Sequence, residues 1–124
     1  MSEVFFSAMS IDQLLKRFEE ACLEQYDTYI TDDLEKFETN FRILVSIKDE
    51  LKARGPEARR SLLRLLSHDN PHVRLQAAKF VYPVARDEAK TSLQDIAAAK
   101  LPDQSLDAKM TLHRLEEVPD CLDH

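Results

Sequence analysis

Glycine is almost absent from this chain: Gly55 is the only one among 124 residues. Folds rich in β-structure need tight turns, and those turns usually draw on glycine or Asn-Gly pairs. A glycine-rich loop that cradles phosphates is impossible with one glycine. Hydrophobic residues still make up 44% of the chain, which is enough for the core of a domain of this length. We therefore predict an all-α fold.

Apolar residues recur at spacings of three and four, which is typical of amphipathic helices. We predict about six helices, near residues 11–30, 34–54, 56–66, 71–82, 87–100 and 106–118. The first two should bury these stripes: Ile11, Leu14, Leu15, Phe18, Cys22, Tyr26 and Tyr29, then Leu34, Phe37, Phe41, Leu44, Ile47 and Leu51.

Helix boundaries are marked by capping residues. Ser10 and Gln13 form a capping box. Gly55 is predicted to end the second helix in the left-handed conformation, and Pro56 to open the third. Asn70 followed by a proline predicts another helix start.

A shift of 31 residues superimposes two parts of the apolar pattern: Ser61 and Leu62 fall on Ser92 and Leu93, and Ala77 on Ala108. Two helical hairpins therefore share one buried pattern, and the first two helices add a third. We predict three stacked antiparallel hairpins in an α-α superhelix, the architecture of helical repeat proteins. The whole chain, 1–124, is expected to be one domain, with flexible ends at 1–9 and 119–124.

Charge is distributed unevenly behind a net charge of -6. Residues 1–50 hold 5 basic and 12 acidic side chains, residues 51–86 hold 8 basic and 2 acidic, and residues 87–124 hold 4 basic and 9 acidic. The basic middle has two interpretations. It balances the acidic helices within the molecule, or it forms a cationic face for an acidic partner.

Catalytic and metal-binding patterns are weak. His68 and His72 are four residues apart, but a predicted helix start lies between them, so we expect no metal site. Paired carboxylates lie off the apolar stripes, and no Ser, Cys or Lys has an adjacent base at nucleophile spacing. Cys22 belongs to a buried stripe. We predict a protein that is not an enzyme and needs no cofactor.

The start of the chain has neither a basic segment nor a long apolar stretch, and no run approaches the length of a membrane helix. We therefore expect a cytoplasmic protein without membrane association.

An arginine-rich segment is the remaining candidate for function. Arginine pairs well with carboxylates and phosphates. We predict a protein-interaction module whose partner is acidic, with nucleic acid an unlikely ligand because aromatic residues are not interleaved with the basic ones. The alternative is a regulatory factor that binds nucleic-acid phosphates through residues 52–86, and homo-oligomerisation is compatible with both. The candidate binding residues are Arg54, Arg59, Arg60, Arg64 and Arg74.

Residues 65–78, which include His68, Pro71, Val73, Arg74 and paired alanines, resemble the core of a HEAT repeat. HEAT repeats usually carry an aspartate where this chain has His68. The wider pattern resembles a bacterial family known as domain of unknown function 2019. The features that carry this second resemblance are residues 11–14, Lys36-Phe37 with Asn40, residues 50–59 and Val73-Arg74. The resemblance implies an α-α superhelix and implies no activity.

Overall fold

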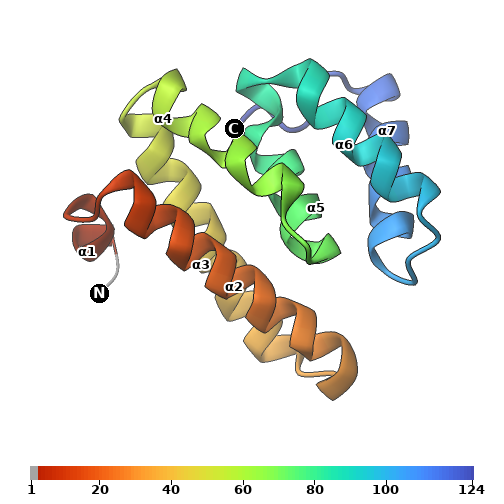
Figure 1. Cartoon of the computed structure of the whole chain (residues 1–124), viewed down its shortest axis with the longest axis horizontal. Helices are drawn as coiled ribbons and strands as arrows, with labels where there is room; N and C mark the ends of the chain where they lie inside the picture. Colours follow the sequence, from red (N-terminus) through yellow and green to blue (C-terminus); the bar gives the residue numbers. More distant parts are fainter. Residues whose placement is uncertain (1–2) are drawn as a thin grey trace. The chain divides into compact units, whose positions relative to one another are not determined.

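The all-α prediction is confirmed. The computed structural model describes residues 3–124, with side chains from Phe5 onward, and 81% of it is helical, with no strand among the described residues. The elements are α1 (Glu3–Ser7), α2 (Ile11–Thr31), α3 (Leu34–Ala53), α4 (Pro56–Arg60), the 3-10 helix η1 (Ser61–Ser67), α5 (Pro71–Val81), the 3-10 turn η2 (Tyr82–Val84), α6 (Arg86–Ala98) and α7 (Gln104–Glu117). Figure 1 shows their order along the chain.

The chain divides after Ser61 into two compact units. The first contains the α2–α3 hairpin, with α1 against α3. The second contains α5, α6 and α7, which contact one another. The boundary lies at the start of η1.

The predicted single helix over residues 56–66 is wrong. α4 ends after five residues, and the chain continues as η1. Ser61 lies at the change, and its side-chain Oγ donates to the Ala58 carbonyl oxygen three residues earlier. Such local bonds compete with the regular helical ladder, and a tighter 3-10 turn follows here.

Gly55 has a positive φ, as the capping pattern required, but it is not left-handed. Arg54 ends α3 with helical φ and ψ, and Gly55 follows at φ 113° and ψ 168°. That combination is an extended region used almost only by glycine. It turns the chain directly into Pro56 at the start of α4.

The α2–α3 hairpin buries most of its predicted stripes. Leu14, Phe18, Leu44, Ile47 and Leu51 have no exposed surface. The members nearest the connecting turn behave differently. Contrary to the predicted burial, partly or largely exposed side chains are found at Tyr26, Tyr29, Leu34 and Phe41.

The capping box is confirmed: Gln13 N donates to Ser10 Oγ, and Ser10 N donates to Gln13 Oε1 at 2.8 Å. Asn70 Oδ1 accepts from the backbone N–H groups of His72 and Val73 at the start of α5. The N-terminal caps of α2 and α5 therefore provide acceptors for backbone N–H groups that would otherwise lack partners.

Candidate interaction surfaces

Arg54, the first candidate binding residue, holds the N-terminal turn of its own unit. Its Nη2 donates to the carbonyl oxygens of Phe6, Ser7 and Met9 at 3.3, 3.4 and 2.7 Å. Its Nε donates to Glu50 Oε2 at 2.8 Å. A guanidinium fork suits this task because it directs several donors at once. A partner would have to compete with these bonds.

Arg74 holds a turn in the second unit. Its Nη1 donates to the carbonyl oxygens of His68 and Asp69 at 2.7 and 3.0 Å. His68 Nδ1 in turn accepts from Asn70 N at 2.9 Å. The arginine therefore braces the loop before α5 through main-chain oxygens, without the aspartate that HEAT repeats usually supply.

The three remaining arginines differ in exposure. Arg59 on α4 is buried, with 3% of its surface exposed. Arg60 is half-buried, and Arg64 on η1 is exposed. All three make interactions within the molecule. Their role in partner binding stays a prediction, and Arg60 and Arg64 are the two that a partner can reach.

His72 is an interior residue of the second unit, 1% exposed. Its ring nitrogens lie 3.4 Å from the amide nitrogens of Gln76 and Gln104. A neutral imidazole has one donor and one acceptor nitrogen. One glutamine therefore donates its amide N–H to the ring. The other accepts the ring N–H through its amide oxygen, which requires its amide to be turned about the terminal C–C bond. Burial lowers the pKa of His72 to about 4; the negative charge of Asp107 opposes this shift by a smaller amount, and the positive charge of Lys79 adds to it. The ring is therefore neutral at pH 7.

No cluster of three or more His, Cys, Asp or Glu with the geometry of a metal site occurs among residues 3–124 as described. Cys22 is fully buried, and burial raises the pKa of its thiol, so the thiolate needed for reaction is disfavoured. His113 is exposed beside Glu116 and Glu117 on the surface of α7. None of these groups forms a catalytic constellation with another.

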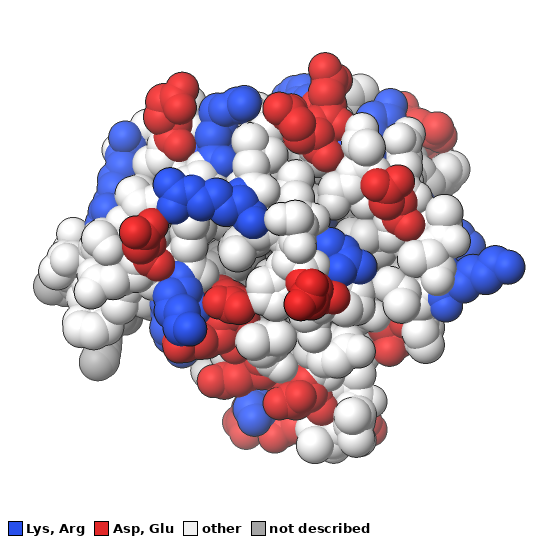
Figure 2. Space-filling view, viewed as in Figure 1, with Lys and Arg blue, Asp and Glu red and all other residues white. Residues whose placement is uncertain are grey.

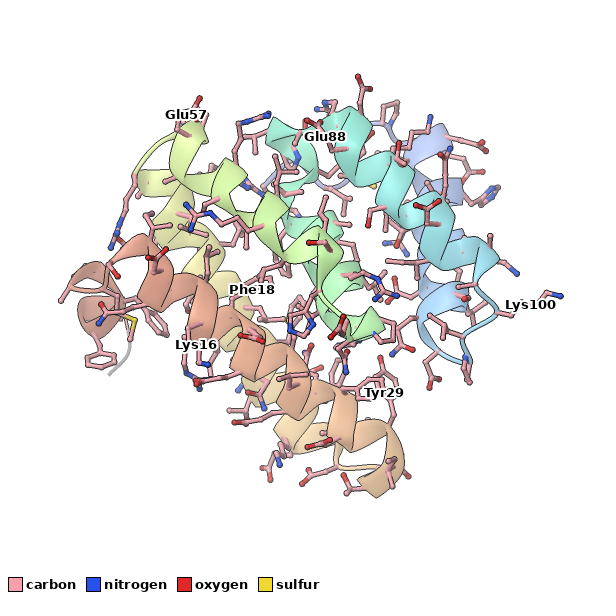
Figure 3. All side chains as sticks on the ribbon, viewed as in Figure 1. Lys16, Phe18, Tyr29, Glu57, Glu88 and Lys100 are labelled. Atoms are coloured by element: carbon pink, nitrogen blue, oxygen red, sulfur yellow. The ribbon has the colours of Figure 1, made fainter. Side chains whose placement is uncertain are left out.

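The turn end of the α2–α3 hairpin carries large exposed apolar side chains. We call this region the hairpin tip and define it by Tyr26, Tyr29, Ile30, Leu34 and Phe41. Ile30 is 86% exposed and Leu34 is 76% exposed. Tyr29, labelled in Figure 3, lies edge-on to Phe37, with ring centroids 5.9 Å apart. Exposed apolar groups gathered in this way mark interaction sites on soluble proteins.

Acidic side chains surround the hairpin tip. Residues 24–38 contain six carboxylates and one lysine, and all six carboxylates are exposed. Figure 2 shows red side chains gathered at the bottom of the view, where Figure 1 places the α2–α3 turn. An apolar centre with a charged rim is the arrangement expected of a protein-binding patch.

The hairpin tip did not emerge from the sequence as a functional site. Tyr26, Tyr29, Leu34 and Phe41 follow the helical stripe, so their spacing predicted burial. The available signal was Ile30, which stands off the stripe beside the acidic break at residues 31–33. A large β-branched residue off the buried face and next to a polar turn indicates an exposed apolar contact.

These features describe a small all-helical protein. The family model for the domain of unknown function DUF2019 matches residues 12–116, so the chain belongs to that family. No curated protein matches the sequence.

A crystal structure of the protein RPA1889 from Rhodopseudomonas palustris is similar to this chain, with 35% sequence identity and a TM-score of 0.87. The similarity covers 90% of this chain and 92% of that one. None of the described helices has the length and apolar character that crossing a membrane requires.

Proposed function

We propose that this protein is a non-catalytic interaction module that docks a protein partner through the hairpin tip. The observation that carries the proposal is the exposure of Ile30 and Leu34 inside an acidic rim. Burying large apolar side chains supplies most of the free energy of protein association. The rim favours a partner whose docking segment is apolar and basic.

The arginine-rich segment supports docking less well than its composition predicted. Arg54 and Arg74 are committed to carbonyl oxygens of the protein itself, and Arg59 is buried. The remaining two, Arg60 and Arg64, make a smaller cationic surface than five arginines would. We therefore assign the main docking role to the tip and treat the segment 52–86 as the rival surface.

The proposal includes a HEAT-like, cytoplasmic module. Support for HEAT-like hairpins comes from α5, which begins at Asn70 and Pro71 and follows a turn braced by Arg74. Support for the cytoplasm comes from Cys22 and Cys121, which are both free, because reducing compartments keep thiols in that state.

The test is affinity capture from a lysate of the organism that makes the protein, with mass spectrometry and nucleic-acid quantification of the eluate. Wild type is compared with Ile30→Ser/Leu34→Ser, which removes the apolar centre of the tip. The matched control is Leu106→Ser/Met110→Ser, because these α7 side chains are also exposed, at 59% and 54%. Arg60→Glu/Arg64→Glu tests the rival surface.

We expect one protein partner to be lost, by about tenfold or more, from the tip variant and retained by the α7 control. A partner lost only from the arginine variant would transfer docking to the basic segment. Recovery of nucleic acid alone, with a steep dependence on salt, would favour the phosphate-binding alternative. Identical eluates from all four proteins would overturn the proposal.

A further inference from the structure

A groove runs along α3 in the first unit, and neither Leu34 nor Phe41 lines it. It consists of two adjoining hollows of about 590 and 510 Å³. Both hollows are lined by the same four side chains, so they are halves of one groove: Arg17, Thr39, Arg42 and Ile43. Each half has the volume of a typical ligand site.

The two halves have different chemistry. Phe5 and Phe6 of α1, together with Ile43, line the hollow of about 510 Å³ and make it the apolar half of the groove. Glu24, Asp33, Glu35 and Glu38 line the other hollow, which we call the acidic half, because these four carboxylates outnumber its own single cation, Lys36. Figure 1 shows α1 beside the α2–α3 hairpin.

Two guanidinium groups occupy the middle, shared by both halves. Arg17 on α2 has 29% of its side chain exposed, and its ion pair with Glu20 is long at 3.9 Å. Arg42 on α3 is exposed, and it makes no hydrogen bond or ion pair with another residue that the structure describes. Two arginines from different helices can bind one carboxylate with several charge-assisted hydrogen bonds.

Asn40 adds a buried acceptor to the same groove. It lines the acidic half, yet only 2% of the residue is exposed. Its Nδ2 donates to the Lys36 carbonyl oxygen at 3.0 Å, which leaves Oδ1 as the free atom of the amide. This oxygen has no hydrogen-bond partner in the described structure. A buried acceptor without a donor is costly, and a ligand N–H group would satisfy it.

We propose that this groove binds the free C-terminus of a peptide that ends in an apolar residue preceded by basic residues. The terminal carboxylate pairs with Arg17 and Arg42, and the last side chain enters the hollow beside Phe5 and Phe6. A backbone N–H of the peptide donates to Asn40 Oδ1. The preceding basic side chains lie along Glu35 and Glu38.

This order of chemistry, from acidic through cationic to apolar along one groove, matches the order of groups in such a peptide. A fatty acid would use the apolar end and the arginines but would leave Asn40 and the carboxylates without partners. The inference does not rest on docking at the hairpin tip, because Ile30 and Leu34 line neither half of the groove.

The experiment measures binding of fluorescent hexapeptides by polarisation, with the full chain. Each peptide carries its label at the N-terminus and lysines before the last residue. The last residue is Leu, Phe, Val or Asp, and each is made as the free acid and as the amide. Wild type is compared with Arg42→Gln and Asn40→Ala, and with Lys16→Gln, which removes one positive charge beside Arg17 on α2 and outside the groove.

We expect saturable binding of free acids that end in Leu, Phe or Val, and binding at least about tenfold weaker for the amides and for Arg42→Gln. Asn40→Ala should weaken the free acids as well, and Lys16→Gln should leave the dissociation constant within about twofold. Thermal melts check that each variant is folded.

Equal binding of acid and amide would overturn the proposal, as would the absence of binding by every peptide up to about 1 mM. The Ile30→Ser/Leu34→Ser variant should bind these peptides like wild type. Its failure in lysate capture and its success here are therefore separate results.

Discussion

At the scale of single residues, position 55 favours glycine because of its backbone conformation and not because a side chain would lack space. Its φ of 113° lies where side chains of L-residues are rarely found, yet nothing lies within 4 Å of the position a Cβ would take. Gly55→Ala should therefore lower the free energy of unfolding by about 1–2 kcal/mol through backbone strain alone. Urea unfolding with an unchanged m-value measures this difference.

Lys100 offers the opposite change as a control. It holds a φ of 60° after α6, a left-handed conformation that costs a residue with a side chain. Lys100→Gly should raise stability by up to about 1 kcal/mol. If Gly55→Ala left the urea midpoint unchanged while Lys100→Gly raised it, Gly55 would not have the positive φ described here.

Sequence reasoning at this scale succeeded where a residue has one narrow use. The capping residues Ser10 and Asn70 and the positive φ of Gly55 were predictable because few other residues serve those positions. The left-handed assignment of Gly55 failed because glycine has two regions of positive φ, and only the direction of the next helix decides between them.

At the scale of elements, α1 depends on one side chain from the end of α3. Arg54 binds three carbonyl oxygens after the first helical turn, and no pattern in residues 1–9 indicated this, because the contact spans about 45 residues of sequence. A similar separation in sequence prevented prediction of the groove. Arg17 and Arg42 are ordinary surface arginines in the sequence, and only the pairing of α2 with α3 brings them to one hollow.

The Arg54→Lys variant tests the hold on α1. Lysine keeps the charge but lacks the planar fork, so it cannot satisfy three carbonyl oxygens together. We expect faster amide hydrogen exchange at Ala8 and Met9, whose N–H groups bond to the carbonyl oxygens of Phe5 and Phe6. The free energy of global unfolding should fall by only about 1 kcal/mol, because the α2–α3 core is untouched.

The control for this variant is Arg114→Lys, an exposed arginine on α7 in the second unit. It should leave exchange at Ala8 and Met9 unchanged. Unaltered exchange in Arg54→Lys itself would show that α1 is held by the apolar contacts of Phe6 and does not need the guanidinium.

At the scale of the whole molecule, stability is tied to pH through His72. Its pKa in the folded protein is about 4, against an ordinary value of 6.5, because burial disfavours the charged ring. Between these two values the unfolded chain binds the proton and the folded chain does not. Proton binding therefore favours unfolding, and stability should fall as the pH falls from about 6.5 to about 4.

The size of this effect follows from the shift. A difference of one pKa unit corresponds to about 1.4 kcal/mol, so His72 accounts for a loss of about 3 kcal/mol across the interval. Carboxylates also titrate near pH 4, so the informative quantity is the difference between variants. His72→Gln should flatten the dependence of unfolding free energy on pH between 6.5 and 4.5, whatever its stability at pH 7.

His113→Gln is the matched control, because that histidine lies on the surface, with 70% of its side chain exposed. It should keep the wild-type slope in urea unfolding measured at each pH. A slope shared by wild type and His72→Gln would mean that the buried ring takes up its proton without loss of structure. The Gln76 and Gln104 amides would then have to reorient their oxygens toward an imidazolium, because both ring nitrogens become donors.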